Sequence, residues 1–598
     1  MTPETLKDNP FSVQTPESIP AQWTVDLFVD SFSDFPKLQV PGHTFIHGPR
    51  GSGKSMMFRF MQPDCQALAT GKKLHELEYF GAYVPVKNME AAPVELRRFE
   101  YHGGNFVFNE HLLCAYILVK LFRQFKSNPV PFDASRFDVE EAKAFLSETF
   151  LQRLSDCGWK TEAKIPPTLD IESFFDFMAV TINEIWVFAR RFIKSVAMSQ
   201  AAIESYNGPL CSYHDFLLPL LSGFVAKLSI FPKAPLFLLI DDAGYLNIAQ
   251  TMVLNSWIAS RTSSDVSIKV STQLDYRTYK TYSGQRVESP HDFSEINIST
   301  VYTSNKEKYR QRVLEIVERR LSKAGIRQQV EEFFPEDREQ MRAIKAIDEK
   351  YREDWEVDGK GYRARDDANR YARPDFIRAL GGTKKATSTY SYSGFDQLVH
   401  ISSSVVRYFL EPASQMFSEQ KANLSGGEAV TLITPTIQNR IIRHYSDKFL
   451  HSDMDREKKE SESIDTLSQL ENLLNAMGQT FHACLVSDRS ERRVFSIALS
   501  DRLDDETKKV LDLGVQLGYL HASTIGNKKG TGRVPQYILS RRLAPSFNLD
   551  PTSFAGYLFV TNARLKQAMM KPEVWLRDAA KLGVEVLDDD SQLNLFAT

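Results

Sequence analysis

The sequence predicts an α/β protein: a parallel sheet with a large helical insertion, followed by a helical lid and a winged-helix-like domain. Short apolar runs alternate with helical patterns over residues 41–300, which is typical of parallel strands joined by helices. A glycine-rich stretch at residues 48–55 lies between one such run and a helical pattern. A mostly helical stretch, at about residues 109–230, predicts the insertion.

The predicted sheet consists of five apolar runs bounded by turn residues. They cover residues 43–47 (HTFIH), 81–86 (GAYVPV), 236–241 (LFLLID), 267–271 (SIKVS) and 295–299 (EINIS). The main helical patterns cover residues 109–126, 170–205, 213–228, 305–324 and 398–410. A helix, a strand, a helix and a hairpin turn follow at residues 464–485, 493–498, 503–518 and 526–533, and this order predicts the winged-helix-like domain.

These patterns divide the chain into an N-terminal segment, a core, a lid, a winged-helix-like domain and a tail. The expected bounds are 1–40, 41–300, 301–450, 464–560 and 561–598. Residues 331–374, within the lid, mix charges of both signs, which is typical of a solvated helical excursion.

Composition excludes several classes of protein. Hydrophobic residues make up 42% of the 598 residues and charged residues 25%, so a disordered or collagen-like chain is excluded. The net charge of −3 excludes a globally basic nucleic-acid coat, though not a local basic patch. Five scattered cysteines form no CxxC pair, and no apolar run or leader indicates a membrane or export. We expect a cytoplasmic protein without a membrane partner, and no metal, nuclease, protease or deaminase constellation is apparent in the sequence.

Residues 48–55 fit the phosphate-binding pattern GxxxxGK[ST] at every fixed position. Glycines let backbone N–H groups surround a phosphate, and the following helix N-terminus adds partial positive charge. We expect Lys54 to reach the β- and γ-phosphates of ATP and Ser55 to place a hydroxyl on Mg²⁺. The nucleotide-binding residues are therefore Gly48, Pro49, Arg50, Gly51, Ser52, Gly53, Lys54 and Ser55.

An acidic pair ends the apolar run 236–241. A buried strand that ends in an acid presents a carboxylate at the edge of the sheet, so Asp241 is expected to hold the water shell of Mg²⁺. Asp242 occupies the position of a carboxylate that orients attacking water. Aspartate is one methylene shorter than the commoner glutamate, which predicts slow hydrolysis, with the nucleotide acting as a switch.

Further catalytic candidates follow from position. The strand 267–271 should lie beside the Asp241 strand, so a hydroxyl at its end, Thr272 in preference to Ser271, is expected near the γ-phosphate. Arg407 lies on a later helix and either reaches the γ-phosphate from a lid or forms a surface ion pair. An arginine finger acting in trans could be Arg261, Arg277 or Arg286, and the sequence does not choose between them.

Two further segments suggest macromolecular partners. Lys528, Lys529 and Arg533 lie at the hairpin turn and could contact DNA phosphates. Only one good helix lies between the strand 493–498 and the hairpin, whereas a helix-turn-helix needs two, so base readout is not expected and a protein-packing role stays open. The last residues include Gln592, Leu593, Leu595 and Phe596 in QLNLF, which resembles the peptide that binds the bacterial sliding clamp. Alternatively, this apolar tail docks on its own chain.

The order of motifs resembles ORC/Cdc6-like AAA+ ATPases over roughly residues 1–560. It comprises Asn9-Pro10-Phe11, the glycine-rich loop, GAYVPV, LLIDD, Ser289-Pro290-His291-Asp292-Phe293 and SSSVVRYFLE. The likeness is greatest to bacterial members associated with mobile elements and phage defence. It implies that Arg407 lies on the lid helix as the sensor-2 arginine and that the C-terminal region is a winged helix. Asp242 in place of glutamate, and an insertion of about 150 residues, depart from the family pattern.

The resemblance implies an ATPase that senses replication or invading DNA and controls a separately encoded effector in phage defence, either alone or as a self-oligomer. A replication or transposition initiator or loader has the same core. An adaptor that tethers a partner to the sliding clamp is the alternative from another class.

Overall fold

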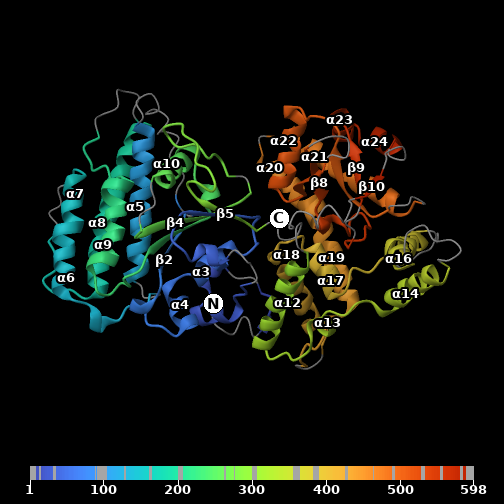
Figure 1. Ribbon diagram of the computed structural model, residues 1–598, viewed down its shortest axis with the longest axis horizontal. Helices are drawn as coiled ribbons and strands as arrows, with labels where there is room; N and C mark the ends of the chain where they lie inside the picture. The colour runs from blue at the N-terminus through green and yellow to red at the C-terminus, as the bar shows by residue number, and fades with distance from the viewer. Residues whose placement is uncertain are drawn as a thin grey trace. The chain divides into compact units, whose positions relative to one another are not determined.

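The computed structural model describes two compact units, coloured along the chain in Figure 1. The N-terminal unit is Gln14–Thr300, and the C-terminal unit combines Met1–Val13 with Val301–Thr598. The described residues are 8–12, 15–30, 35–87, 89, 104–126, 130–159, 164–198, 206–260, 264–274, 276–298, 306–354, 364–381, 389–424, 428–461, 463–487, 492–526, 532–552, 556–578 and 584–586.

A parallel five-stranded sheet forms the centre of the N-terminal unit, which confirms the predicted fold class. Its strands lie in the order β2-β3-β4-β1-β5, and each neighbouring pair is parallel. They are β1 (Thr44–His47), β2 (Phe80–Pro85), β3 (Leu236–Asp241), β4 (Val266–Thr272) and β5 (Ser294–Asn297). The first four are buried along almost their whole length, as expected for strands covered on both faces.

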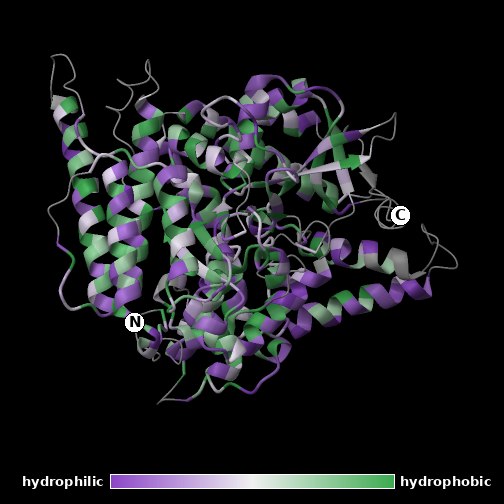
Figure 2. Ribbon diagram, turned by 60° about the vertical axis from the view of Figure 1, so that its left-hand side comes forward, coloured by the Kyte–Doolittle hydropathy of each residue, from purple (hydrophilic) through white to green (hydrophobic). Residues whose placement is uncertain are grey.

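Helices of the N-terminal unit cover the sheet and form the insertion between β2 and β3. They are α2 (Ala21–Leu27), α3 (Lys54–Phe60), α4 (Pro63–Thr70), α5 (Gly104–Lys126), α6 (Val139–Ala144), α7 (Gln152–Asp156), α8 (Ile171–Met198), α9 (Leu218–Lys227) and α10 (Ile248–Ala259). The long α5 and α8 lie side by side (Figure 1). Figure 2 shows hydrophobic and hydrophilic residues alternating around such helices, as expected where one side is buried.

Helix α5 is buried along most of its length. Among the described helices it alone is long and apolar enough to pass a test for spanning a membrane, and most of that window is buried within the protein. Phenylalanines from the insertion and from β2 form an aromatic cluster around its C-terminal half, including Phe80, Phe125, Phe175 and Phe231. The pattern is therefore that of a core helix.

The C-terminal unit contains a helical part. Its helices are α12 (Lys306–Lys323), α13 (Val330–Phe333), α14 (Arg338–Glu353), α16 (Ala364–Gly381), α17 (Phe395–Ile401), α18 (Val406–Ala422), α19 (Pro435–Asp447) and α20 (Met454–Glu460). The charged stretch 331–374 is thus mainly helical where it is described, with α14 and α16 packed together.

A second five-stranded sheet completes the C-terminal unit. Its order is β10-β9-β6-β8-β7; β6 and β9 are parallel, and the other pairs are antiparallel. The elements are α21 (Ile464–Leu485), β6 (Val494–Leu499), α22 (Asp505–Gln516), β7 (Leu520–Gly526), β8 (Arg533–Leu539), β9 (Gly556–Val560), α23 (Asn562–Met570), α24 (Pro572–Asp578) and β10 (Val584–Val586). The hairpin of β7 and β8 occurs where the sequence predicts it, and α22 is the one helix between β6 and β7.

Two expected boundaries need correction. Residues 561–598 are not simply a tail, because β10 pairs with β9 and Trp575 of α24 is buried, donating from Nε1 to Thr480 Oγ1 over 2.8 Å. The segment 1–40 is divided between the units. Asn9 Nδ2 donates to Ser414 O over 2.8 Å in the C-terminal unit, whereas α2 belongs to the N-terminal unit.

Candidate nucleotide-binding site

The glycine-rich loop connects β1 to α3 at the carboxyl edge of the parallel sheet, where open α/β sheets bind ligands. Gly51 and Gly53 have φ values of 84° and 102°, a left-handed conformation that a side chain disfavours. Gly53 directly precedes the first residue of α3, Lys54, and Ser55 follows in the first helical turn. The loop therefore presents its backbone and the helix N-terminus together, which is the arrangement that binds phosphate.

Lys54 closes over this loop. Its side chain is only 6% exposed, and Nζ donates to Gly48 O over 2.7 Å and to Pro49 O over 3.0 Å. Carbonyl acceptors keep the buried ammonium group satisfied. This is the ammonium group that the motif is expected to place on phosphate. The two carbonyl groups hold it beside the backbone N–H groups of the loop.

Asp241 ends β3 as a fixed, buried carboxylate. Oδ2 accepts from Tyr83 Oη over 3.0 Å, and Oδ1 accepts from the backbone N–H of Asp242 over 3.0 Å and from Ser271 Oγ. Tyr83 and Ser271 come from β2 and β4, the strands on either side of β3. The neighbouring strands thus set the orientation of this acid, as partners of metal-binding carboxylates do.

Asp242 follows in a left-handed conformation, with φ of 60° and ψ of 40°, which turns the chain away from the strand. Burial raises the pKa of Asp242, and the Asp241 carboxylate adds to the rise, while Lys54, Lys87 and Arg50 oppose it. A carboxylate with a raised pKa beside several cations is typical of a group that accepts a proton or orients water.

Thr272 ends β4 in register with His47 of β1. The backbone N–H of Gly48 donates to Thr272 O over 3.3 Å, so this strand end is tied to the start of the glycine-rich loop. The side chain is 1% exposed, and Oγ1 has no hydrogen-bond partner among the described residues. Buried hydroxyls in proteins are usually hydrogen-bonded, so Oγ1 of Thr272 keeps an unused bonding position beside the loop.

Three residues around the loop were not predicted to act together. Arg50 donates to Tyr245 Oη, with its guanidinium 5.3 Å from the centre of that ring, and Lys87 Nζ lies 5.7 Å from the same centre. Tyr245 lies in the short helical turn Ala243–Tyr245, directly after Asp242. No spacing in the sequence links Lys87, which follows β2, to the glycine-rich loop.

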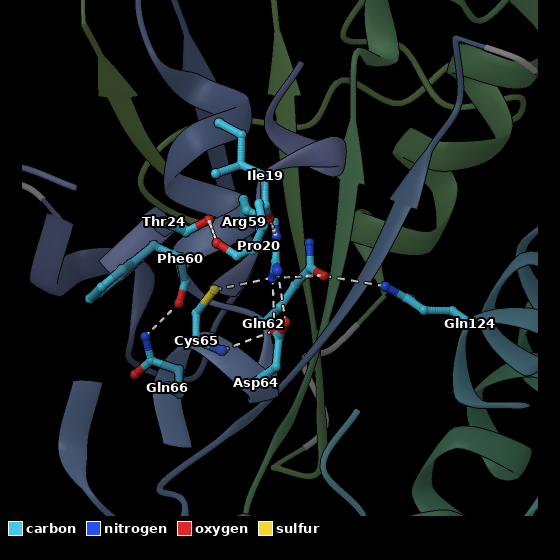
Figure 3. Close-up of polar contacts among 10 residues, drawn as sticks. All are labelled: Ile19, Pro20, Thr24, Arg59, Phe60, Gln62, Asp64, Cys65, Gln66 and Gln124. Atoms are coloured by element: carbon cyan, nitrogen blue, oxygen red, sulfur yellow. Dashed lines mark hydrogen bonds and ion pairs between the residues drawn. The ribbon is translucent and has the colours of Figure 1, made fainter. Parts of the chain in front are cut away.

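The distal end of α3 is anchored by a buried ion pair, drawn in Figure 3. Arg59 donates from Nη1 and Nη2 to the two carboxylate oxygens of Asp64, each over 2.7 Å. Its Nε donates to Ile19 O over 3.3 Å. Gln62 accepts from Gln124 of α5 over 3.3 Å (Figure 3). Helix α3 is therefore fastened to the segment before α2, to α4 and to the insertion.

The arginine candidates have separate positions. Arg407 lies in the C-terminal unit, on the first turn of α18, and its Nε is 3.8 Å from Glu411 Oε1. Arg277 Nε donates to Gly244 O over 3.4 Å, beside the turn that follows Asp242. The backbone of Arg286 forms an isolated antiparallel β-bridge with the backbone of Lys280. Arg261 lies outside the described residues. The N-terminal unit therefore contains Lys54, Asp241, Asp242 and Thr272, whereas the C-terminal unit contains Arg407.

The expected DNA and clamp contacts fall largely outside the described residues, which exclude Lys528, Lys529 and the QLNLF segment. Arg533 is described, and its guanidinium is engaged within the hairpin. It donates from Nε to Thr524 Oγ1 over 2.7 Å and from Nη2 to Thr524 O over 2.9 Å.

Among the described residues, no group of three or more histidines, cysteines or acids could hold a metal ion by itself.

No protein of curated function matches the chain significantly. A model of the ORC-CDC6-like family matches residues 9–559, which is most of the chain. This match includes the glycine-rich loop, both acids and the first sheet. The chain belongs to the ORC-CDC6-like family, and its fold is that of a P-loop AAA+ protein.

Proposed function

We propose that this protein binds ATP with Mg²⁺ at the carboxyl edge of the first sheet and hydrolyses it slowly. The observation that carries the proposal is the convergence of Lys54, Asp242 and the unpartnered hydroxyl of Thr272 around one glycine-rich loop. Each group matches a need of phosphoryl transfer: a cation for the phosphates, a base or water-orienting acid, and a polar group for the reacting end.

The residues present fit the nucleotide and its metal. Lys54 would exchange its two carbonyl acceptors for phosphate oxygens, and backbone N–H groups of residues 48–55 would surround the β-phosphate. Ser55 and Asp241 would hold Mg²⁺, the aspartate through water, since Tyr83 and Ser271 already fix its oxygens. When bound, Mg²⁺ supplies charge neutralisation at the phosphates.

Asp242 would orient water for attack, and its raised pKa favours proton acceptance. The side chain of aspartate is shorter than that of glutamate, and the left-handed backbone of Asp242 fixes the position from which this side chain extends. These two features support slow turnover and a role for the nucleotide as a conformational switch.

Calorimetry and an ATPase assay on two variants test the proposal. Lys54→Ala should weaken ATP affinity at least a hundredfold, because it removes a charge paired with phosphate. Asp242→Asn should bind ATP normally and lose turnover. Lys73→Ala, which is exposed on the same unit, is the control and should behave as wild type. Unchanged affinity in Lys54→Ala would exclude this loop as the site.

The wider role is also a proposal: a nucleotide-controlled regulator of a partner effector in phage defence that responds to DNA or replication. The family match supports the ATPase core of this role. DNA contact through Lys528 and Lys529 and clamp binding through residues 592–596 rest on sequence pattern alone. Purified sliding clamp, mixed with the protein and with a tail-deleted variant, tests the clamp-tethering alternative. If that alternative is correct, only the protein that retains residues 592–596 should bind the clamp.

A further inference from the structure

Three of the five cysteines lie together in the helical insertion of the N-terminal unit. Cys114 is buried in the middle of α5, Cys157 follows the last residue of α7, and Cys211 precedes the helical turn Tyr213–Leu217. All three are free thiols. The Cys157 and Cys211 side chains lie close enough for each to shift the pKa of the other.

The backbones that carry this pair are already fixed beside each other. The N–H of Leu210 donates to Cys157 O over 3.1 Å, and the N–H of Cys211 donates to His111 Nδ1 of α5 over 3.0 Å. The N–H of Cys157 donates to Arg153 O over 3.0 Å, which completes α7. A backbone hydrogen bond that links Cys157 to the residue before Cys211 brings the two cysteines to adjacent positions, as a disulfide requires.

The two thiols differ in exposure and in acidity. Cys157 is partly exposed, whereas Cys211 is 3% exposed. The interaction with Cys211 lowers the pKa of Cys157, although burial and the nearby Asp215 and Asp156 oppose this. The same interaction and burial raise the pKa of Cys211. The accessible thiol is therefore the better nucleophile, and the buried thiol beside it is placed to resolve the product.

We propose that Cys157 and Cys211 form a redox-responsive pair that a hydroperoxide converts into a reversible disulfide. In the first step the Cys157 thiolate attacks the peroxide oxygen, the O–O bond breaks, and the leaving oxygen takes a proton. Cys157 becomes a sulfenic acid, and hydrogen peroxide yields one water. In the second step Cys211 sulfur attacks Cys157 sulfur, the S–O bond breaks, and the Cys211 proton leaves with hydroxide as a second water. The sulfurs lose two electrons and the peroxide gains them.

The bond would close a loop that contains all of α8 and fasten the end of α7 to the segment before Tyr213. That segment is already linked to α5 and, through it, to α10. Glu110 of α5 accepts at Oε1 from the N–H of Tyr213 and from Nε1 of Trp257 in α10, each over 3.0 Å. Helix α10 follows the turn after Asp242. Oxidation would therefore restrain the part of the insertion that packs against the helix next to the nucleotide site.

Mass spectrometry of the full-length protein tests the pair. The reduced protein is treated with hydrogen peroxide, alkylated under denaturing conditions and digested without reductant. Each molecule should lose two of its five alkylatable thiols, and the digest should contain a peptide joining Cys157 to Cys211. Dithiothreitol should restore all five thiols. Retention of both thiols, or a cross-link from Cys157 to Cys114 instead, would overturn the proposal.

Two variants separate the steps. Cys211→Ser lacks the resolving thiol, so Cys157 should remain a sulfenic acid that a cyclic 1,3-diketone probe labels. Cys114→Ser, the neighbouring buried thiol on α5, is the matched control and should give the same cross-link as wild type. Peroxide treatment of Cys211→Ser without labelling at Cys157 would show that Cys157 is not the attacking thiol. The wild-type experiment needs neither variant to fold.

Discussion

Because the hydroxyl of Thr272 has no partner among the described residues, removing it should raise the stability of the protein and lower its ATPase activity. Thr272→Val keeps the shape of the side chain and removes only the hydroxyl. Burying a hydroxyl without a hydrogen bond costs about 1–3 kcal/mol in proteins. Since Oγ1 has no partner among the described residues, the valine variant should raise the free energy of unfolding of the N-terminal unit by about 1 kcal/mol or more.

The same variant should slow hydrolysis. A polar group oriented at the reacting phosphate typically contributes a factor of about 10²–10³ to kcat. We expect a fall in kcat of that size with ATP affinity nearly unchanged, because in the proposed site Lys54 and the loop backbone would supply the binding contacts. A variant that becomes more stable and less active cannot owe its lost activity to misfolding.

The adjacent Ser271 is the matched control. Its hydroxyl donates to Asp241 and accepts from the N–H of Asp242 over 3.0 Å. Ser271→Ala removes a hydrogen bond to a charged group and should lower the free energy of unfolding by about 2 kcal/mol. Urea titration followed by tryptophan fluorescence gives both values, and single-turnover ATP hydrolysis gives the rates. The reasoning would be refuted if Thr272→Val destabilised the unit as Ser271→Ala does, or if it left hydrolysis unchanged.

Two further predictions concern stability. Asp64→Asn leaves the buried Arg59 charge without its partner and should destabilise the N-terminal unit by about 3–5 kcal/mol in urea titration, whereas Lys72→Met in an exposed pair should leave the midpoint unchanged. Burial lowers the pKa of His43 and His111 to about 4, and each accepts a backbone N–H at Nδ1. Below about pH 6.5 the unfolded chain therefore binds more protons than the folded chain. The free energy of unfolding should fall by up to about 3 kcal/mol per histidine between pH 6.5 and 4. A urea midpoint that does not change from pH 7 to 4.5 would contradict this.

The first sheet and the phosphate loop could be predicted because their signals are local. The pattern GxxxxGK[ST] lies within eight residues, and each strand of the sheet is a short apolar run. The strand 267–271 even contains Lys269, whose amine is fully buried. Burial lowers the pKa of Lys269 to about 7, and its ammonium group donates to Val40 O and Gly42 O over 2.8 and 2.7 Å. A lysine in a buried strand needs such distant carbonyls, and no local pattern reveals them.

The C-terminal end was harder to predict for a related reason. Strand β10 has only three residues, and its partner β9 pairs in parallel with β6 across more than fifty residues of sequence. Short strands that depend on distant partners have weak periodicity of their own. The division of residues 1–40 between the two units has the same origin. Phe11 is fully buried against Phe333, Phe334 and Phe417, contacts more than three hundred residues away in the chain.

Ser271 and Thr272, the two candidates that spacing leaves open, differ in what their hydroxyls contact. Successive residues of a strand point to opposite faces, so two neighbouring hydroxyls cannot serve the same group. Ser271 points to Asp241 and is satisfied there, which makes it a positioning residue for the acid proposed to hold Mg²⁺. Thr272 points elsewhere, toward the turn after Asp242: a Cβ placed on Gly244 would lie 3.8 Å from its Oγ1. Its hydroxyl is the one that keeps a free bonding position beside the phosphate loop, and therefore the one whose removal should cost activity without costing stability.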